Sequence, residues 1–161
     1  MQPFPHRYVV QAAGQPTGDL DLSSNALPRL SSDSPKEFGG SGERWSPETL
    51  LVGAVGDCFV LTFRAVAAAS RLPWNALSCS VAGTLDRVDR VTQFTAFDLE
   101  AHLDVPAGTD LDLARHLLEK AERNCLVSNS LKGTLHLTPV VTVAGASVGF
   151  GDRVLGELSL Q

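Results

Sequence analysis

The sequence has no excess of basic residues. Lysine and arginine number 13 among 161 residues, against 18 aspartates and glutamates, and the formal net charge is −5. A duplex nucleic-acid binder normally carries a basic stripe, and an anionic membrane surface attracts basic clusters. We therefore expect neither nucleic acid nor a membrane as a partner, and the charge mainly favours solubility.

Cysteine is also scarce. Three cysteines, an odd number, do not make a disulfide scaffold in a chain of this length. The start, Met1 to His6, is polar and proline-rich, not a basic segment followed by an apolar one. Both absences favour a cytoplasmic, reducing location, where a cysteine pair that oxidises is more often catalytic or sensing than structural.

Motifs of cofactor chemistry are absent as well. The sequence contains no glycine-rich phosphate motif, no group of ligands at metal-binding spacing and no nucleotide fingerprint. We therefore expect no cofactor and no metal.

The length is that of one domain with its own core. We expect a single domain over 1–161, with its core at about 8–143 and a glycine-rich tail at 144–161. Segments 7–12 and 19–23 predict strands, and 28–46, rich in proline, serine and glycine, predicts a long loop.

An apolar run predicts a long helix over 46–70. The Ser-Pro-Glu sequence that opens it supplies an N-cap, a proline at the first helical position and an acidic residue at the positive end of the helix dipole. The helix is long enough to span a bilayer, but Asp57 and Arg64 lie inside it, and each costs about 2.5–3.5 kcal/mol at a membrane centre. We therefore interpret it as a buried central helix.

Alternating segments at 76–85 and 94–105 predict strands joined by a polar hairpin at 86–92, and a last strand is expected at 134–141. Cys79 shares a strand face with apolar neighbours and is interpreted as a core residue.

A second helix is predicted between these strands, capped by Thr109. Its apolar positions follow helical spacing: Leu111, Ala114, Leu118, Ala121 and Cys125. That stripe places Cys125 on the buried side.

A helix that is apolar all round needs more burial than one sheet provides. We expect an obligate homodimer in which two such helices pair, with Gly53 and Gly56 at the close contact.

Cys58, in the apolar helix, and Cys125 allow two interpretations. They form a redox pair, one attacking and one resolving, or both are small core residues, since free cysteine is among the most buried residue types. Attack requires a thiolate, and Cys125, at a helix C-terminus, faces the wrong end of the dipole. Cys58, deep in a helix, gains little from the dipole and needs a cation brought from elsewhere.

Five segments carry a family resemblance, in order and at familiar separations from about Tyr8 to Val143. They are Ser34-Pro35-Lys36-Glu37-Phe38-Gly39-Gly40, Ser46-Pro47-Glu48-Thr49-Leu50-Leu51, the apolar helix with Cys58, the Val105-Pro106 turn, and Asn124-Cys125-Leu126-Val127-Ser128-Asn129-Ser130-Leu131. Together they resemble the OsmC/Ohr family of osmotically induced and organic-hydroperoxide-resistance proteins.

The resemblance implies an α+β fold in which antiparallel sheets wrap around a long central apolar helix in an intertwined homodimer. It also implies a thiol-dependent peroxidase that reduces organic hydroperoxides through a sulfenic acid and then a disulfide. In that picture Cys58 is the peroxidatic cysteine, Cys125 is the resolving cysteine, and Glu48 is the glutamate that holds a catalytic arginine. A dihydrolipoyl-type or other thiol system would reduce the disulfide.

The chain departs from the family at the arginine. The first hairpin has no basic residue, and Pro16 lies about where Ohr-type proteins carry the arginine. The loop before the helix offers Lys36 as the cationic partner, with Arg29 and Arg44 nearby, although lysine is not equivalent to the planar arginine fork.

Glu48 precedes Cys58 by ten residues. That separation is about 15 Å along a continuous helix. Glu48 is therefore expected to serve the site of the partner chain.

Three functions from different classes follow. The first is the peroxidase, with an apolar pocket at the dimer interface lined by Phe38, Phe59 and Phe63, for which plain core packing is the alternative. The second is a non-enzymatic OsmC-like dimer that binds a small apolar ligand. The third is a cysteine hydrolase with His102 or His116 as base, although a solvated face explains both histidines.

Overall fold

The computed structural model describes residues 3–143. The chain divides into two compact units, Met1–Leu51 and Val52–Gln161. The single domain expected over 1–161 stays a prediction, and the tail expected at 144–161 lies outside the described residues.

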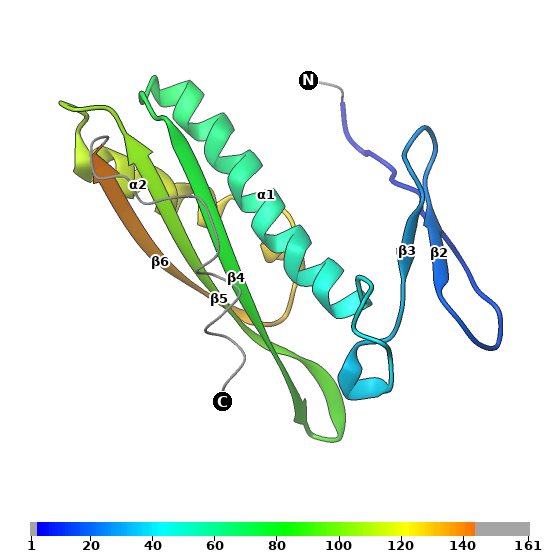
Figure 1. Cartoon of the computed structure of the whole chain (residues 1–161). Helices are drawn as coiled ribbons and strands as arrows, with labels where there is room; N and C mark the ends of the chain where they lie inside the picture. The colour runs from blue at the N-terminus through cyan, green and yellow to red at the C-terminus, as the bar shows by residue number, and fades with distance from the viewer. Residues whose placement is uncertain (1–2, 144–161) are drawn as a thin grey trace. The chain divides into compact units, whose positions relative to one another are not determined.

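The first unit contains a small antiparallel sheet in the order β1-β2-β3 (Figure 1). Its strands are β1 (Gln11–Ala13), β2 (Leu20–Ser23) and β3 (Leu30–Ser32). The sequence did not predict β3, which lies at the start of the expected loop, because three residues are too few for an alternating pattern to stand out. The 3-10 helix η1 (Lys36–Phe38) follows within that loop.

Helix α1 (Pro47–Ser70) begins as the sequence predicts. The Ser46 hydroxyl accepts a hydrogen bond from the amide of Thr49 at 3.2 Å, and the Thr49 hydroxyl accepts one from the amide of Ser46 at 2.8 Å. This reciprocal pair satisfies two of the amides that a helix start leaves without partners.

The second unit holds a three-stranded sheet in the order β4-β5-β6. The strands are β4 (Ala76–Val88), β5 (Val91–Val105) and β6 (Thr134–Val143). The hairpin between β4 and β5 is tighter than the predicted 86–92, because Asp89 and Arg90 both adopt positive φ angles, as a two-residue turn of type I′ requires.

The α+β fold class is confirmed, but one strand direction differs from the expectation. Strand β5 pairs with β4 in antiparallel fashion and with β6 in parallel fashion. The connection from β5 to β6 runs through α2 (Leu111–Arg123), and such a crossover brings the chain back to enter β6 in the direction of β5.

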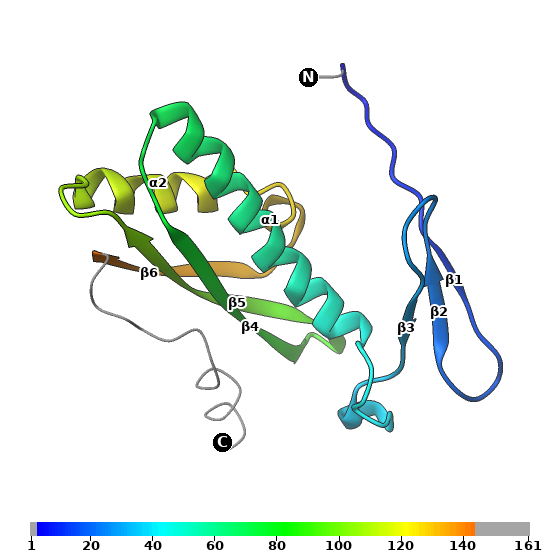
Figure 2. The same ribbon diagram turned by 45° about the horizontal axis from the view of Figure 1, so that its top comes forward.

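Helices α1 and α2 cover one face of this sheet (Figures 1 and 2). On β5, alternate side chains are fully or almost fully buried: Phe97, Leu99, Ala101, Leu103 and Val105. The side chains between them are exposed or half-buried on the other face of the sheet. The core of the second unit therefore lies between the sheet and the two helices.

One line of residues along α1 is fully buried in that core: Val55, Phe59, Phe63 and Ala67. By length and composition α1 could cross a bilayer, with a mean hydropathy of 1.8, yet it packs on the β4-β5-β6 sheet. Gly56 faces the chain's own strand β4, since an added Cβ would lie 3.2 Å from Val81 Cγ2. Gly56 therefore gives close contact between α1 and β4 of the same chain. Its expected contact with the α1 helix of a second copy stays a prediction.

The cap of α2 corrects the sequence prediction. Asp110, not Thr109, accepts hydrogen bonds from the amides of Asp112 and Leu113, both at 3.0 Å. Thr109 instead donates its hydroxyl to the carbonyl of Pro106 at 2.8 Å. The predicted stripe is confirmed, with Leu111 half-buried and the remaining members fully buried: Ala114, Leu118, Ala121 and Cys125.

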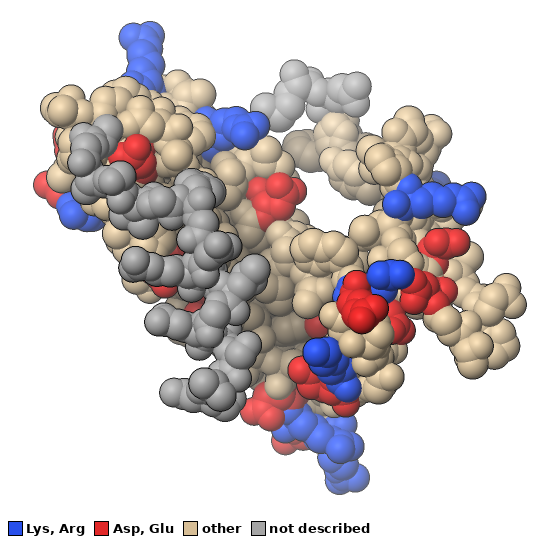
Figure 3. All heavy atoms as spheres, viewed as in Figure 1, with Lys and Arg blue, Asp and Glu red and all other residues tan. Residues whose placement is uncertain are grey.

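Charges of both signs are interspersed on the face of the molecule that Figure 3 displays.

Candidate active site

The structure brings Cys58 and Cys125 together. Cys58 lies midway along α1, and Cys125 follows the last residues of α2. Both carry free thiols, and the Cys125 thiol is a hydrogen-bond partner of the Cys58 sulfur. The Cys125 sulfur also lies 4.0 Å from the carbonyl oxygen of Val55, one helical turn before Cys58.

The turn that follows Cys125 is held by its own hydrogen bonds. The amide of Asn129 donates to the carbonyl of Cys125 at 3.0 Å, and the hydroxyl of Ser130 donates to the carbonyl of Leu126 at 2.8 Å. The side-chain amide of Asn129 donates to the carbonyl of Arg123 at 3.0 Å. These bonds leave the amides of Leu126 and Val127 directed at Cys58.

The pKa of the Cys58 thiol lies below its ordinary value. Burial alone would raise this pKa, but several hydrogen-bond donors outweigh it. In decreasing order of effect they are the amide of Val127, the thiol of Cys125, the hydroxyl of Thr62 and the amide of Leu126. Cys58 is therefore the more readily ionised thiol of the pair.

The pKa of Cys125 is shifted in the opposite direction. Burial raises it, the hydroxyl and amide of Ser128 partly offset that rise, and the neighbouring Cys58 raises it again. Cys125 has no exposed surface, whereas Cys58 is partly exposed. One thiol thus ionises readily and can be approached, and the other stays protonated and enclosed.

Cys79 is the third thiol, on β4. Burial, followed by the charge of Cys125, raises the pKa of Cys79 to about 12. It is therefore a poor nucleophile. It is half-buried and lies beside Gly56, so the core role expected for it holds only in part.

A hollow of about 310 Å³ lies between α1 and β4. Its lining residues are Val52, Gly53, Gly56, Asp57, Val60, Cys79 and Val81. It is mainly apolar and reaches Cys79, but neither Cys58 nor Cys125 lines it.

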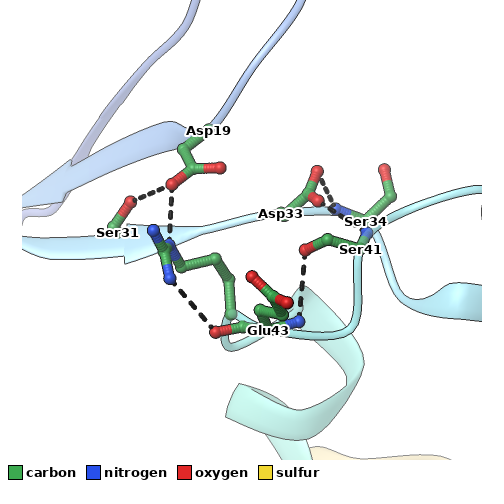
Figure 4. A network of polar contacts seen from close by, with 7 residues as sticks. Asp19, Ser31, Asp33, Ser34, Ser41 and Glu43 are labelled. Atoms are coloured by element: carbon green, nitrogen blue, oxygen red, sulfur yellow. Dashed lines mark hydrogen bonds and ion pairs between the residues drawn. The ribbon is translucent and has the colours of Figure 1, made fainter.

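Two of the expected cations have acidic partners within the first unit, and Figure 4 shows one of these partners, Asp19. Arg44 Nε lies 2.7 Å from Asp19 Oδ2, a contact that lowers the pKa of Asp19 and raises that of Arg44. Arg29 Nη1 lies 3.9 Å from Asp21 Oδ2. The third candidate, Lys36, takes no part in an ion pair among residues 3–143.

Other polar bonds in Figure 4 shape the loop that carries these cations. Asp33 accepts hydrogen bonds from the amides of Ser34 at 2.8 Å and Ser41 at 3.0 Å, and the Ser41 hydroxyl accepts one from the amide of Glu43 at 3.1 Å. These hydrogen bonds fix the conformation of the loop between residues 33 and 43. The composition of the sequence predicted a loop here but not these bonds.

Glu48 lies in the first turn of α1. Its Oε2 atom is buried and has no hydrogen-bond partner among the described residues 3–143. A buried carboxylate oxygen without a partner is costly, which marks a position that a donor or cation can complete.

The expected aromatic pocket residues are found in different environments. Phe59 and Phe63 are fully buried in the core of the second unit, which is the packing role that the sequence also allowed. Phe38 is 60% exposed in the first unit. A pocket that joins all three at a dimer interface stays a prediction.

The two histidines do not support a cysteine hydrolase. His102 lies on the face of the sheet opposite the helices, 2.6 Å from Glu100 Oε1. His116 is exposed on α2. Neither is among the groups that shift the pKa of Cys58.

Sequence reasoning did not find Thr62, Leu126, Val127 or Ser128 as site residues. Two of them act through backbone amides, which leave no side-chain signature. The hydroxyls of Thr62 and Ser128 resemble ordinary helix and turn residues, and only their proximity to the sulfurs distinguishes them.

Known proteins share both the sequence pattern and the fold. Residues 40–139 match the family described as OsmC-like protein. The protein YmaD of Bacillus subtilis is 27% identical over 106 residues, which cover 64% of this chain and 71% of YmaD.

Two solved structures extend the likeness. An OsmC-like protein of Vibrio cholerae superposes with a TM-score of 0.77 at 15% identity, over 84% of this chain and all of that one. An organic hydroperoxide resistance protein OsmC of Legionella pneumophila gives a TM-score of 0.69 at 25% identity, over 88% of this chain and all of that one. With the family match over more than half of its length, the chain belongs to the OsmC-like family.

Proposed function

We propose that the protein is a thiol-dependent peroxidase that reduces organic hydroperoxides with Cys58 and Cys125. The observation that carries the proposal is the contact between two free thiols whose pKa values are shifted in opposite directions. The OsmC of Legionella pneumophila, a relative of the same fold, is named an organic hydroperoxide resistance protein.

The first step is attack by the Cys58 thiolate. Its sulfur attacks the distal oxygen of the hydroperoxide and bonds to it, the O–O bond breaks, and the departing alkoxide takes a proton to become an alcohol. Cys58 is thereby oxidised to a sulfenic acid. Donors around a sulfur favour its thiolate form, and the thiolate is the nucleophile.

The second step closes a disulfide. The Cys125 sulfur attacks the Cys58 sulfur, the S–O bond breaks, and water leaves with the thiol proton. A dithiol reductant, dihydrolipoyl-type or other, then returns both thiols by exchange. The cycle needs neither metal nor cofactor.

Glu48 and a cation complete the proposed site. An orphaned carboxylate oxygen favours a basic group supplied by a second copy of the chain. Arg29 and Arg44 already have acidic partners in the first unit, so Lys36 is the better candidate. A lysine in this place would act as a point charge. The directional hydrogen bonds to the Cys58 sulfur would come from the amides of Leu126 and Val127.

The homodimer is part of the same proposal. Among the described residues 3–143, only 22% of the most apolar 18-residue stretch of α1 is buried, and Leu61 on its outer side is 50% exposed. A second copy would bury this surface. A cytoplasmic location, with neither nucleic acid nor membrane as a partner, stays a prediction from composition.

The hollow beside Cys79 favours a second candidate function. Its apolar lining suits a small apolar ligand, so an OsmC-like dimer that binds such a ligand without chemistry is the alternative.

A pH titration of Cys58 alkylation separates the two functions. It is best measured in a Cys79→Ser variant that keeps Cys125, with mass spectrometry reading alkylation at Cys58 itself and Cys58→Ser as the blank. The peroxidase requires a midpoint below about 8.5, the pKa of a free thiol. A midpoint above that value would contradict the peroxidase and favour the binding protein.

A further inference from the structure

Ser128 makes a contact that the first step of the proposed cycle does not use. Its hydroxyl donates a hydrogen bond to the Cys125 sulfur at 3.1 Å. Ser128 is half-buried and opens the 3-10 helix η2 (Ser128–Ser130), three residues after Cys125. The amide of Asn129, donating to the Cys125 carbonyl at 3.0 Å, closes the same turn and fixes the distance between serine and cysteine.

The surroundings of Cys125 make this donor important. The sulfur has no exposed surface, so water does not solvate it directly. The residues that carry it into the core, Leu118 and Ala121, are apolar and fully buried. A thiolate formed there needs a hydrogen-bond donor from the protein.

The titratable groups that face Cys125 do not supply that help. They are Cys58 from α1 and Cys79 from β4. Both are thiols, and a negative charge on either one opposes ionisation of Cys125. The hydroxyl of Ser128 is therefore the side-chain donor that remains.

We propose that Ser128 is a positioning residue for the resolving step, which holds the Cys125 sulfur toward Cys58 and donates a hydrogen bond to it as it becomes a thiolate. In that step Cys125 gives up its proton, its sulfur bonds to the Cys58 sulfur, and the S–O bond of the sulfenic acid breaks to release water. The inference rests on the proposed two-cysteine cycle. It adds a residue that promotes disulfide closure and has no part in peroxide attack.

The test is a single turnover of the reduced protein with one equivalent of cumene hydroperoxide, in a Cys79→Ser background. Samples are quenched with dimedone, and mass spectrometry separates the sulfenic acid from the disulfide. Ser128→Ala is compared with Ser128→Thr, which keeps the hydroxyl, and with Ser130→Ala. Ser130 lies in the same turn but donates to the Leu126 carbonyl, not to a sulfur.

Ser128→Ala is expected to slow disulfide closure by about threefold for each unit by which the pKa of Cys125 rises, because lost thiolate outweighs gained nucleophilicity. The pH profile of closure shifts to higher pH, and sulfenic acid forms at the unaltered rate. Ser128→Thr restores closure, and Ser130→Ala closes the disulfide at the parent's rate, whatever its effect on peroxide attack through the turn at Leu126. Unchanged closure in Ser128→Ala, or equal slowing in Ser130→Ala, would overturn the role of Ser128.

A second measurement keeps this test independent of the peroxidase. If the parent forms no sulfenic acid, the proposed function fails at its first step. Ser128 is then tested by the ultraviolet absorbance of the Cys125 thiolate in a Cys58→Ser, Cys79→Ser variant. Ser128→Ala must move its pH midpoint upward, and an unmoved midpoint would refute the inference.

Discussion

At the scale of single residues, Cys58 is activated by donors that surround its sulfur. The sequence suggested that a thiol in the middle of an apolar helix requires a cation, because the helix dipole acts only at the ends. In the second unit, two turn amides, a hydroxyl and a thiol lower its pKa against the effect of burial. Hydrogen bonds to the charged form thus favour the thiolate, and a cation would add to their effect.

Thr62→Val removes one of these donors while keeping the volume of the side chain. Because the hydroxyl favours the thiolate, its loss raises the pKa of Cys58 and reduces the thiolate fraction at every pH below that pKa. A hydrogen bond to a charged group contributes about 1.5 kcal/mol or more, which raises the pKa by about one unit. Alkylation at neutral pH should then slow by about threefold, because gained nucleophilicity offsets part of the lost thiolate. Thr62→Ser keeps the donor and should react like the parent, and equal rates for Val and Ser would contradict the assignment.

At the scale of elements, strong local signals predicted the long pieces of the fold. The cap, the proline and the apolar run place α1, and alternation places β4, β5 and β6. The same pattern could not give the direction of β6, which depends on the path through α2, nor the three-residue strand β3. Thr109 and Asp110 are both good caps, and only the backbone geometry selects Asp110.

The sequence likewise predicted only part of the candidate site. The stripe on α2 placed Cys125 on the buried side, and the family resemblance paired it with Cys58. The turn after Cys125 was not predictable, since Leu126 and Val127 contribute amides that any residue but proline possesses. Arg44 stays a predicted cationic partner, but its ion pair with Asp19 could not be predicted, because Asp19 lies far away in sequence and pairs with it only in the folded unit.

At the scale of the whole molecule, the outer side of α1 is partly exposed among the described residues of the second unit, with Leu61 50% exposed. Apolar surface contributes about 25 cal/mol per Å² when it is buried, so leaving this side in water is unfavourable. We expect sedimentation to find a dimer at micromolar concentration. Leu61→Glu, on the outer side of α1, should weaken the dimer, and Leu113→Glu, a partly exposed leucine on α2, should not. A stable, folded monomer of the parent chain would contradict this expectation.

The central claim is that Cys58 reduces an organic hydroperoxide and Cys125 resolves the product. Stopped-flow mixing of the reduced Cys79→Ser protein with cumene hydroperoxide tests it most directly. We expect oxidation much faster than that of free cysteine at neutral pH, a stable sulfenic acid in Cys125→Ser, and no reaction in Cys58→Ser. A rate no greater than that of free cysteine, or one that survives in Cys58→Ser, would contradict the account.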